Sequence, residues 1–376
     1  MYRIRTDIMH GNAALASVVD EDVPAIHFSS HPHGATETLW WCFRLERTGP
    51  APDTVRLVWE HVGNCLGLGP DTIHLLHPVV RHDGGAWKRL PAGTRRDRAD
   101  GGAAAVWETP APQHWLEAAF CFPHGPDDIA DFVAETGWRR DVIGVSSGGR
   151  ELIRVANDYG TAGSARPGIY CVAHQHSSEM SGAWTLHGFL EEMACRGEAA
   201  PLVWSVPVTN VDGTVEGDYG KDPFPWDLNR AWGYPPMRIE VLACMRDIEV
   251  WRSRCRPVLC LDFHSPGGAE DYGCYTFLLD PKLFPDEHAR GAVWADAFAA
   301  ELGDLAWSDF KRALIYPDRF RTDQHASFNR FYSKGELVGM IFEIPYHRIG
   351  KRVLEIADYR EIGRRMAVVV CRRLAR

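Results

Sequence analysis

The feature that most constrains the fold is a change of rhythm near residue 120. Beyond it, fully apolar runs alternate with segments long enough to be helices. The runs are 166–173, 200–210, 257–265, 273–280 and 337–346, and the longer segments are 180–197, 238–254 and 286–302. Apolar strands separated by amphipathic helices are typical of a mixed, mostly parallel sheet flanked by helices on both faces. We therefore expect an α/β catalytic domain over residues 121–376.

The preceding residues follow a different pattern. Short apolar or alternating segments such as 25–30, 38–46 and 54–62 are separated by Gly, Pro and Asp. Short strands at this spacing indicate an antiparallel β-sandwich. We expect a small domain of this type over residues 1–120, in which the Gly- and Arg-rich stretch 91–102 is a surface loop.

Composition excludes several classes of partner. The net charge of −9 argues against nucleic acid, because phosphate binding requires clustered Lys and Arg. No run of 18 apolar residues occurs, so we expect no membrane span. The N-terminal residues carry charges where an export signal would be apolar, and no CxxC pair suggests a cysteine metal site. We expect a cytoplasmic protein whose ten cysteines are reduced.

In open α/β sheets, functional sites lie beyond the carboxyl ends of strands, and the first candidate follows the run ending at Ala173. There, His174 and His176 lie two residues apart, and an extended backbone would place them on one face. Glu179 follows His176 by three residues, just before an expected helix near Met180. An imidazole and a carboxylate at this spacing can bind one zinc ion. The alternative is a surface histidine followed by a glutamate that favours a helix N-terminus.

Two further candidates come from later strands. The run PVLCLDFHS ends in His264, which can supply a third ligand, while Asp262 can orient an imidazole. Glu343 stands inside the strongly apolar run LVGMIFEIPY, where a carboxylate is unfavourable unless it meets a metal, a cation or a site. A histidine bonded to its own loop and a salt-bridged structural glutamate are the respective alternatives.

Together these residues predict a catalytic zinc site. His176, Glu179 and His264 would hold one Zn²⁺, leaving a fourth position for water, and Glu343 would be the general base. The joint occurrence of the three motifs in the α/β half, each within or at the end of an apolar strand, favours this interpretation over three unrelated structural roles.

These motifs resemble those of the zinc metallocarboxypeptidases, the carboxypeptidase A-like family, and within it the cytosolic carboxypeptidase subgroup. The resemblance includes the H-x-x-E step, the third ligand in DFHS and the glutamate of the last strand. It also includes TNVDGTVEGDYGKDPFPWDLNRAW, which looks like the subgroup's N-P-D-G…L-N-R-x-W segment. The expected β-sandwich and the lead-in VIGVSSGGRELI extend the match to nearly the whole chain.

The resemblance implies a reaction and a substrate. Metal-activated water would cleave a C-terminal residue from a peptide, with Glu343 as base, and the partner would be a peptide or small amide with a free C-terminal carboxylate. Asn229 and Arg230 would bind that carboxylate, Arg230 through a bidentate pair. Read without the family, Asn229 and Arg230 are also compatible with a loop pair whose arginine bridges to a nearby acid.

The sequence departs from the subgroup at one important position. The arginine expected to stabilise the oxyanion aligns with Gly220, and Lys221 is the candidate substitute, although an ammonium lacks the guanidinium fork. The family also carries a mobile tyrosine before the base strand. Tyr316 is our candidate, with Tyr332 and Tyr346 as rivals.

Two other functions remain open. An amidohydrolase of the aspartoacylase or desuccinylase type would use the same metal site on small N-acyl amino acids, and the missing arginine keeps this alternative alive. A pseudoenzyme would bind zinc or peptide without turnover, but a pure binder does not need Glu343.

Overall fold

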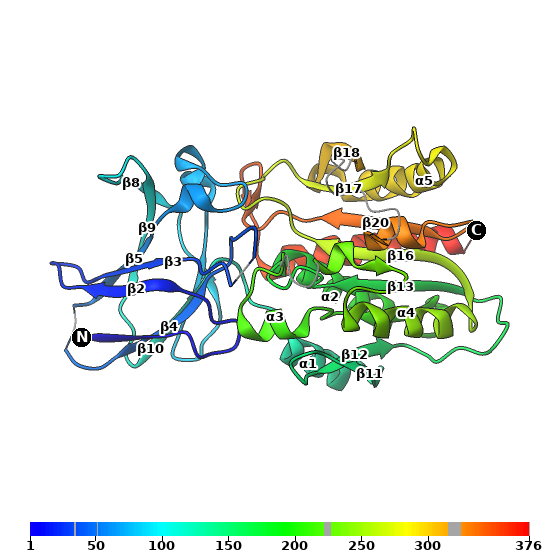
Figure 1. Ribbon diagram of the computed structural model, residues 1–376, viewed down its shortest axis with the longest axis horizontal. Coiled ribbons are helices and arrows are strands. Elements are labelled where there is room, and N and C mark those ends of the chain that lie inside the picture. The colour runs from blue at the N-terminus through cyan, green and yellow to red at the C-terminus, as the bar shows by residue number, and fades with distance from the viewer. Residues whose placement is uncertain (34, 51, 222–226, 315–324, 376) are drawn as a thin grey trace.

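The computed structural model describes residues 1–33, 35–50, 52–221, 227–314 and 325–375. Two β-sheets built from the N-terminal strands form one end of an elongated molecule, and a larger sheet with its helices forms the other (Figure 1). The passage between them follows strand β10 (Trp115–Ala119) and precedes helix α1 (Pro126–Thr136). The change of rhythm in the sequence therefore corresponds to a change of architecture, and the division into domains at residue 120 remains our proposal.

The N-terminal sheets each have five strands. In order across the first sheet these are β1 (Tyr2–Arg5), β4 (Cys42–Arg47), β10, β6 (Val79–His82) and β7 (Lys88–Arg89). The second sheet has β2 (Ala14–Val19), β3 (Ala25–Ser29), β5 (Thr54–Trp59), β9 (Ala103–Pro110) and β8 (Thr94–Asp97). The neighbouring strands are antiparallel except β3 and β5, which run parallel. Aromatic side chains join the two sheets, because Phe28 of β3 lies 4.8 Å from the rings of both Trp41 and Phe43.

Strand β8 corrects one expectation. It lies inside the stretch 91–102, which we predicted as a surface loop, and it pairs with β9 over Thr94–Asp97. Three of its four side chains are exposed, and its sequence TRRD lacks the apolar face of an internal strand. Charged, exposed residues are common on edge strands, where they discourage pairing with another chain. The strand could therefore not be recognised from the composition of the stretch.

The C-terminal half contains an eight-stranded sheet. In order across the sheet, its strands are β11 (Arg139–Val145), β12 (Glu151–Ala156), β14 (Leu202–Val206), β13 (Pro167–Ala173), β16 (Arg256–His264), β20 (Val338–Glu343), β17 (Cys274–Leu279) and β18 (Ala306–Leu314). The central strands β14, β13, β16 and β20 are parallel, and β17 runs antiparallel to β20. The mixed, mostly parallel sheet predicted from the sequence is confirmed.

Helices cover both faces of this sheet. Helices α2 (Met180–Cys195), α5 (Pro285–Leu302) and α7 (Ile356–Leu374) share one apolar core, whereas α4 (Ile239–Arg252) and α6 (Phe328–Tyr332) belong to a second. Alternate residues of β13 enter the two cores, Ile169 the first and Tyr170 the second. Two buried faces explain why the central strands read as continuous apolar runs rather than as alternating ones.

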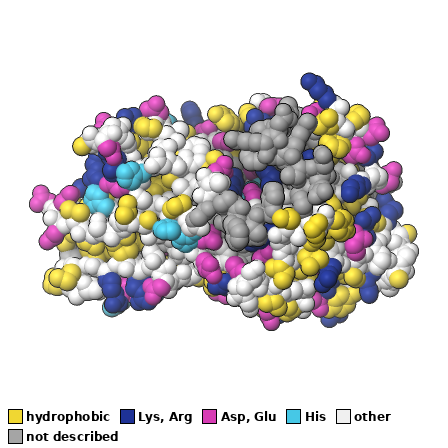
Figure 2. All heavy atoms as spheres, viewed as in Figure 1, with side chains coloured by type: hydrophobic (Ala, Val, Ile, Leu, Met, Phe, Trp, Pro, Cys, Tyr) yellow, Lys and Arg dark blue, Asp and Glu magenta, His cyan; other side chains and the backbone are white. Residues whose placement is uncertain are grey.

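Short elements complete the chain around this framework. Helix α3 (Val211–Glu216) follows β14, and two two-stranded ladders pair β15 (Trp232–Gly233) with β19 (His325–Ala326) and β21 (Arg348–Ile349) with β22 (Arg352–Val353). All ten cysteines are free. Within the described ranges, no helix has the length and apolar character that crossing a bilayer requires. On the face shown in Figure 2, acidic and basic side chains are interspersed over both halves of the molecule.

Three central strands bring distant residues to one edge. Because β13, β16 and β20 are adjacent and parallel, the segments that follow their carboxyl ends meet there. In register, Ala173 lies beside Phe263, and His264 lies beside Glu343. Neighbouring strands are about 4.8 Å apart, so the sheet alone places these ends within side-chain reach.

The close crossing of α2 and α7 generates a test of the packing. A Cβ at Gly188 would lie 2.1 Å from the carbonyl oxygen of Arg360, so alanine requires the helices to separate. Although alanine is the better helix former, we expect Gly188→Ala to lower the free energy of unfolding by about 1–3 kcal/mol, measured by urea denaturation. Gly63→Ala is the control, because nothing lies within 4 Å of a Cβ there. Equal stability of the two variants would contradict the close crossing.

Candidate metal centre

The three residues predicted as metal ligands come together in the structure. His176, Glu179 and His264 are buried, and each offers a ligand atom that lies within 4.8 Å of the others. Glu179 stands between the two imidazoles, with Oε1 2.8 Å from Nδ1 of His176 and Oε2 2.6 Å from Nδ1 of His264. The two Nδ1 atoms are 3.2 Å apart. Two nitrogens and a carboxylate therefore face one point.

The loop between β13 and α2 sets the position of two of these residues. Its first residue, His174, has φ +54°, an unusual backbone conformation for a residue other than glycine. The expected shared face of His174 and His176 is wrong, because this turn directs His174 elsewhere. Its Nδ1 lies 2.6 Å from the carbonyl oxygen of Ser177, and its Nε2 lies 3.1 Å from His124. His174 therefore braces the loop and does not join the three ligands.

The far nitrogen of each ligand imidazole faces a carboxylate. Nε2 of His264 lies 2.8 Å from Asp262, and Nε2 of His176 lies 3.2 Å from both carboxylate oxygens of Asp227. A carboxylate at Nε2 favours the tautomer that carries its proton there, and so leaves a lone pair on Nδ1. Asp262 thus has the orienting position expected from the sequence.

This tautomer provides a test of whether a metal ion fits. With protons on both Nε2 atoms, two Nδ1 lone pairs and the Glu179 carboxylate all present electron pairs to the same small space. Acceptors facing one another in a buried site repel unless a cation lies between them. The donor set therefore suits a divalent metal ion.

The pKa directions of the histidines agree with that need for positive charge. Burial alone would lower the pKa of His264, but Asp262 and Glu179 raise it well above its ordinary value. Burial likewise opposes protonation of His176, while Glu179 and Asp227 raise its pKa. In the absence of a metal ion, protons are the available cations at these two positions.

Glu179 is held by more than the imidazoles. Its Oε2 accepts a hydrogen bond from the backbone N–H of Ser265 at 3.1 Å, so its carboxylate is anchored to the end of β16. Burial would raise the pKa of Glu179, but His176 and His264 hold it well below the ordinary value. The carboxylate is therefore ionised, as a metal ligand must be.

Glu343 lies beside the ligands but is bonded differently. Glu343 is the last residue of the adjacent strand β20, where it lies directly opposite His264. The residue is half-buried. Its Oε2 is shielded from solvent and has no hydrogen-bond partner. Burial and the nearby charge of Glu179 raise the pKa of Glu343. Its role as the general base remains a prediction.

Asn229 and Arg230 are placed close to the ligands by a short 3-10 helix, Leu228–Arg230. Asn229 is buried, and its Nδ2 lies 3.3 Å from Nε2 of His264. Its Oδ1 accepts a hydrogen bond from the backbone N–H of Phe328 at 3.2 Å. Arg230 donates to the carbonyl oxygen of Asn229 at 2.7 Å. Their role in substrate binding remains a prediction.

Lys221 also reaches the ligand group. Its Nζ lies 3.9 Å from Oε1 of Glu179 and 3.1 Å from Oε2 of Glu37, a residue of the N-terminal half. Burial would lower the pKa of Lys221, but Tyr219, Glu179 and Glu37 raise it, so the ammonium is charged. Gly220, where the family pattern expects arginine, has φ +94°, and a Cβ there would lie 2.2 Å from the backbone nitrogen of Ser177. No side chain fits at that position.

The tyrosine candidates fare differently. Tyr316 lies outside the described residues. Tyr332 is buried in the core shared by α4 and α6. Tyr346 is also buried, packs its ring 5.2 Å from that of Phe120, and has a hydroxyl group without a hydrogen-bond partner. Which tyrosine serves the site remains a prediction.

Sequence reasoning missed two residues of this centre. Asp227 precedes the Leu-Asn-Arg segment, and its position as the acid before a short helix was the available signal. Its side chain caps that helix by accepting from the N–H of Asn229 at 2.8 Å. Glu37 carries no local signal, because it belongs to the other half of the chain.

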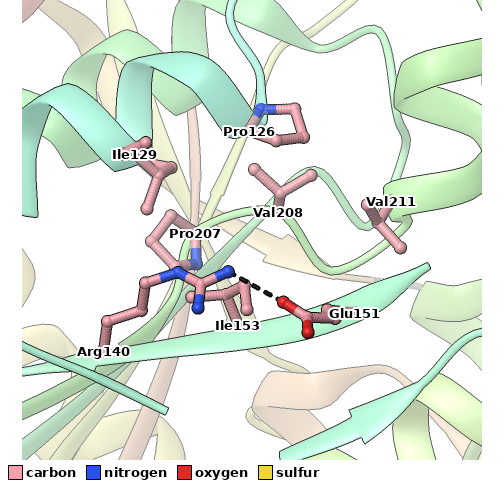
Figure 3. Close-up of a pocket in the computed structure, with 9 residues that line it drawn as sticks. Pro126, Ile129, Arg140, Glu151, Ile153, Pro207, Val208 and Val211 are labelled. Carbon is pink, nitrogen blue, oxygen red and sulfur yellow. Dashed lines mark hydrogen bonds and ion pairs between the residues drawn. The ribbon is translucent and has the colours of Figure 1, made fainter. Parts of the chain in front are cut away.

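The molecule also has a small apolar pocket away from the metal centre, which is too small to be an alternative ligand site. It lies beside α1 and is lined by Pro126, Ile129, Val208 and neighbouring residues, with the Arg140–Glu151 ion pair, 2.8 Å long, across it (Figure 3). Its volume of about 80 Å³ is well below the roughly 300 Å³ at which ligand sites begin. None of the predicted site residues lines it.

Comparison with solved structures places the chain in a known architecture. A metallo-carboxypeptidase from Burkholderia cenocepacia superimposes with a TM-score of 0.76 at 19% identity, covering 98% of each chain. The metallo-carboxypeptidase from Pseudomonas aeruginosa, in complex with (2-guanidinoethylmercapto)succinic acid, gives 0.73 at 20% identity, again over 98% of both chains. The chain has the metallocarboxypeptidase fold. The match includes the N-terminal sheets, since it extends over nearly the whole length. No family model matches the sequence.

In this metallocarboxypeptidase fold, the orienting carboxylates generate a second test. We expect Asp262→Asn to weaken divalent-metal affinity about 10–100-fold, because an amide no longer enforces the Nε2–H tautomer of His264. Competition with a chelator, followed in the purified protein, measures the change. Asp20→Asn, at an exposed position of the N-terminal half, is the matched control and should leave the affinity unchanged. An unaltered affinity in Asp262→Asn would contradict the orienting role.

Proposed function

We propose that the protein is a zinc-dependent carboxypeptidase that removes a C-terminal residue from a peptide. The observation that carries the proposal is the convergence of His176, Glu179 and His264 on one point beside the half-buried Glu343. The fold of the solved metallo-carboxypeptidases supports it.

The donor set favours zinc among divalent metals. Two imidazole nitrogens and one carboxylate oxygen are the ligands typical of catalytic zinc sites, which keep a fourth position for water or substrate. When bound, zinc would supply a Lewis acid that polarises the scissile carbonyl and acidifies the attacking water. Asp262 and Asp227 would keep both imidazoles in the tautomer that binds the metal.

Glu343 would move the proton. Its unpaired Oε2 can accept a proton from the attacking water and then deliver it to the nitrogen of the leaving amine. The two transfers return Glu343 to its starting state at the end of each cycle.

The cationic and polar residues around the ligands would bind the substrate. Arg230 and Asn229 would hold the terminal carboxylate, and the ammonium of Lys221, 3.9 Å from Glu179, would face the negative charge that develops on the carbonyl oxygen. The solved structure of the Pseudomonas aeruginosa metallo-carboxypeptidase is a complex with a succinic acid derivative. Its binding of a carboxylic acid agrees with recognition of a carboxylate here. A cytoplasmic setting belongs to the same proposal.

An amidohydrolase acting on small N-acyl amino acids is the second candidate, and glycine at position 220 favours it, because the oxyanion arginine is absent there. A panel that sets dipeptides and longer peptides against N-acyl amino acids, with released amino acids measured by mass spectrometry, separates the two. We expect release of single C-terminal residues from peptides. Turnover confined to N-acyl amino acids would replace the proposal with the alternative, and bound zinc without any hydrolysis would indicate a pseudoenzyme.

Removal of the base should separate turnover from metal binding. We expect Glu343→Gln to lower kcat by about 10²–10⁴-fold while metal content, measured by atomic absorption, stays at the wild-type level. His264→Ala should instead lose the metal. The control is Glu336→Gln, an exposed glutamate that precedes the same strand. Retained turnover in Glu343→Gln would refute its assignment as the base.

A further inference from the structure

One charged contact links the two halves of the molecule at the metal centre. The ammonium of Lys221 lies between Glu37, 3.1 Å away on the N-terminal half, and Glu179, 3.9 Å away among the ligands. Its Nζ lies 5.4 Å from the centroid of the buried ring of Tyr219. Lys221 therefore connects Glu37 to the ligand group, although Glu37 and Lys221 are more than 180 positions apart in the sequence.

Glu37 does not act alone in making this contact. The backbone N–H and the hydroxyl group of Thr36 each donate to the carbonyl oxygen of Lys221 at 3.4 Å. Nδ1 of His33 contacts the carboxylate of Asp218, and Nδ2 of Asn12 donates to the carbonyl oxygen of Gly217 at 2.7 Å. The N-terminal half thus holds the segment 217–221 by its backbone as well as by its charges.

A single ion pair at a surface contributes little, since exposed pairs are typically worth less than about 1 kcal/mol. Here the Lys221 side chain is 21% exposed and that of Glu37 is 41% exposed, and the hydrogen bonds from Thr36 to the carbonyl oxygen of Lys221 hold the two backbone segments together. Ordering of the two side chains therefore costs less than in a free pair. An ammonium carries three N–H donors, so pairing with Glu37 leaves donors for a substrate oxygen.

The geometry of the neighbouring residue explains why the charge must come from position 221. Gly220 packs against the metal-binding loop so closely that a side chain there would collide with the backbone of Ser177. The required cation cannot stand at that position, and a flexible lysine at the next one needs a partner that fixes its direction. Glu37 occupies the place of such a partner.

We propose that Glu37 is a positioning residue that holds the Lys221 ammonium beside the metal ligands, so that the N-terminal half completes the active site. The inference rests on the proposed hydrolase function, in which Lys221 faces the developing oxyanion. It adds that a residue outside the α/β half sets the efficiency of the reaction.

A double-mutant cycle on the full-length, metal-loaded enzyme tests this. We expect Lys221→Met to lower kcat by about 10²-fold, as for loss of one oxyanion donor, and Glu37→Gln to lower kcat about tenfold with KM little changed. In the Lys221→Met background, Glu37→Gln should have no further effect. Lys221→Gln serves as the second variant if the methionine variant does not fold. Glu108→Gln, which removes the Arg56–Glu108 ion pair within the N-terminal half, is the control.

Equal losses from Glu37→Gln with and without Lys221 would overturn the proposal, because they would show that Glu37 acts on general stability. The lysine NH₃⁺ resonances of the metal-free protein give a readout that does not depend on turnover. The Lys221 signal, assigned by its loss in Lys221→Met, should be sharp in the wild type and broadened in Glu37→Gln. An unchanged signal would also overturn the proposal. If wild-type enzyme releases no C-terminal residue, the proposed function fails, and this spectrum still decides the contact.

Discussion

The structure depends on one electrostatic arrangement, in which the buried Glu179 carboxylate stands between two imidazoles whose Nδ1 atoms are 3.2 Å apart. Three electron-pair donors cannot share a buried space without a cation. The sheet supplies the geometry, because β13 and β16 are adjacent and parallel and end at the same level. A bound cation would offset the desolvation of these buried polar groups, which otherwise opposes folding.

The carboxylates around the centre have separate roles that follow from their environments. Asp262 is buried and bonded to an imidazole, so its charge is used to fix a tautomer. Glu343 has an oxygen without a partner and a raised pKa, so its proton affinity remains available for chemistry. The carboxyl groups of Glu179 and Glu343 have opposite pKa directions: the two histidines lower the pKa of Glu179 despite its burial, whereas burial and the charge of Glu179 raise the pKa of Glu343. The proposal of Glu179 as ligand and Glu343 as base therefore draws on their environments as well as on residue type.

Much of the fold and the three residues that come together at the candidate metal centre could be predicted from sequence, because they depend on local pattern. Fully apolar runs indicated central strands, and polar residues at their ends indicated His176, Glu179 and His264. The misses share a different cause. His174 points away from the ligands because its φ is positive, and no residue in the local sequence indicates that conformation. Strand β8 has the composition of a loop. Contacts between distant segments, such as Glu37 with Lys221, have no local signature.

Such long-range contacts also change how the N-terminal half should be understood. It binds the segment that ends at Lys221, and that segment binds the metal loop in turn, since the hydroxyl of Ser177 donates to the carbonyl oxygen of Asp218 at 2.8 Å. The backbone N–H of Ser178 also contacts the carbonyl oxygen of Tyr219, at 3.4 Å. A continuous series of hydrogen bonds thus runs from the β-sheets to the loop that carries two ligands. The N-terminal half is thus connected by hydrogen bonds to the loop that holds His176 and Glu179.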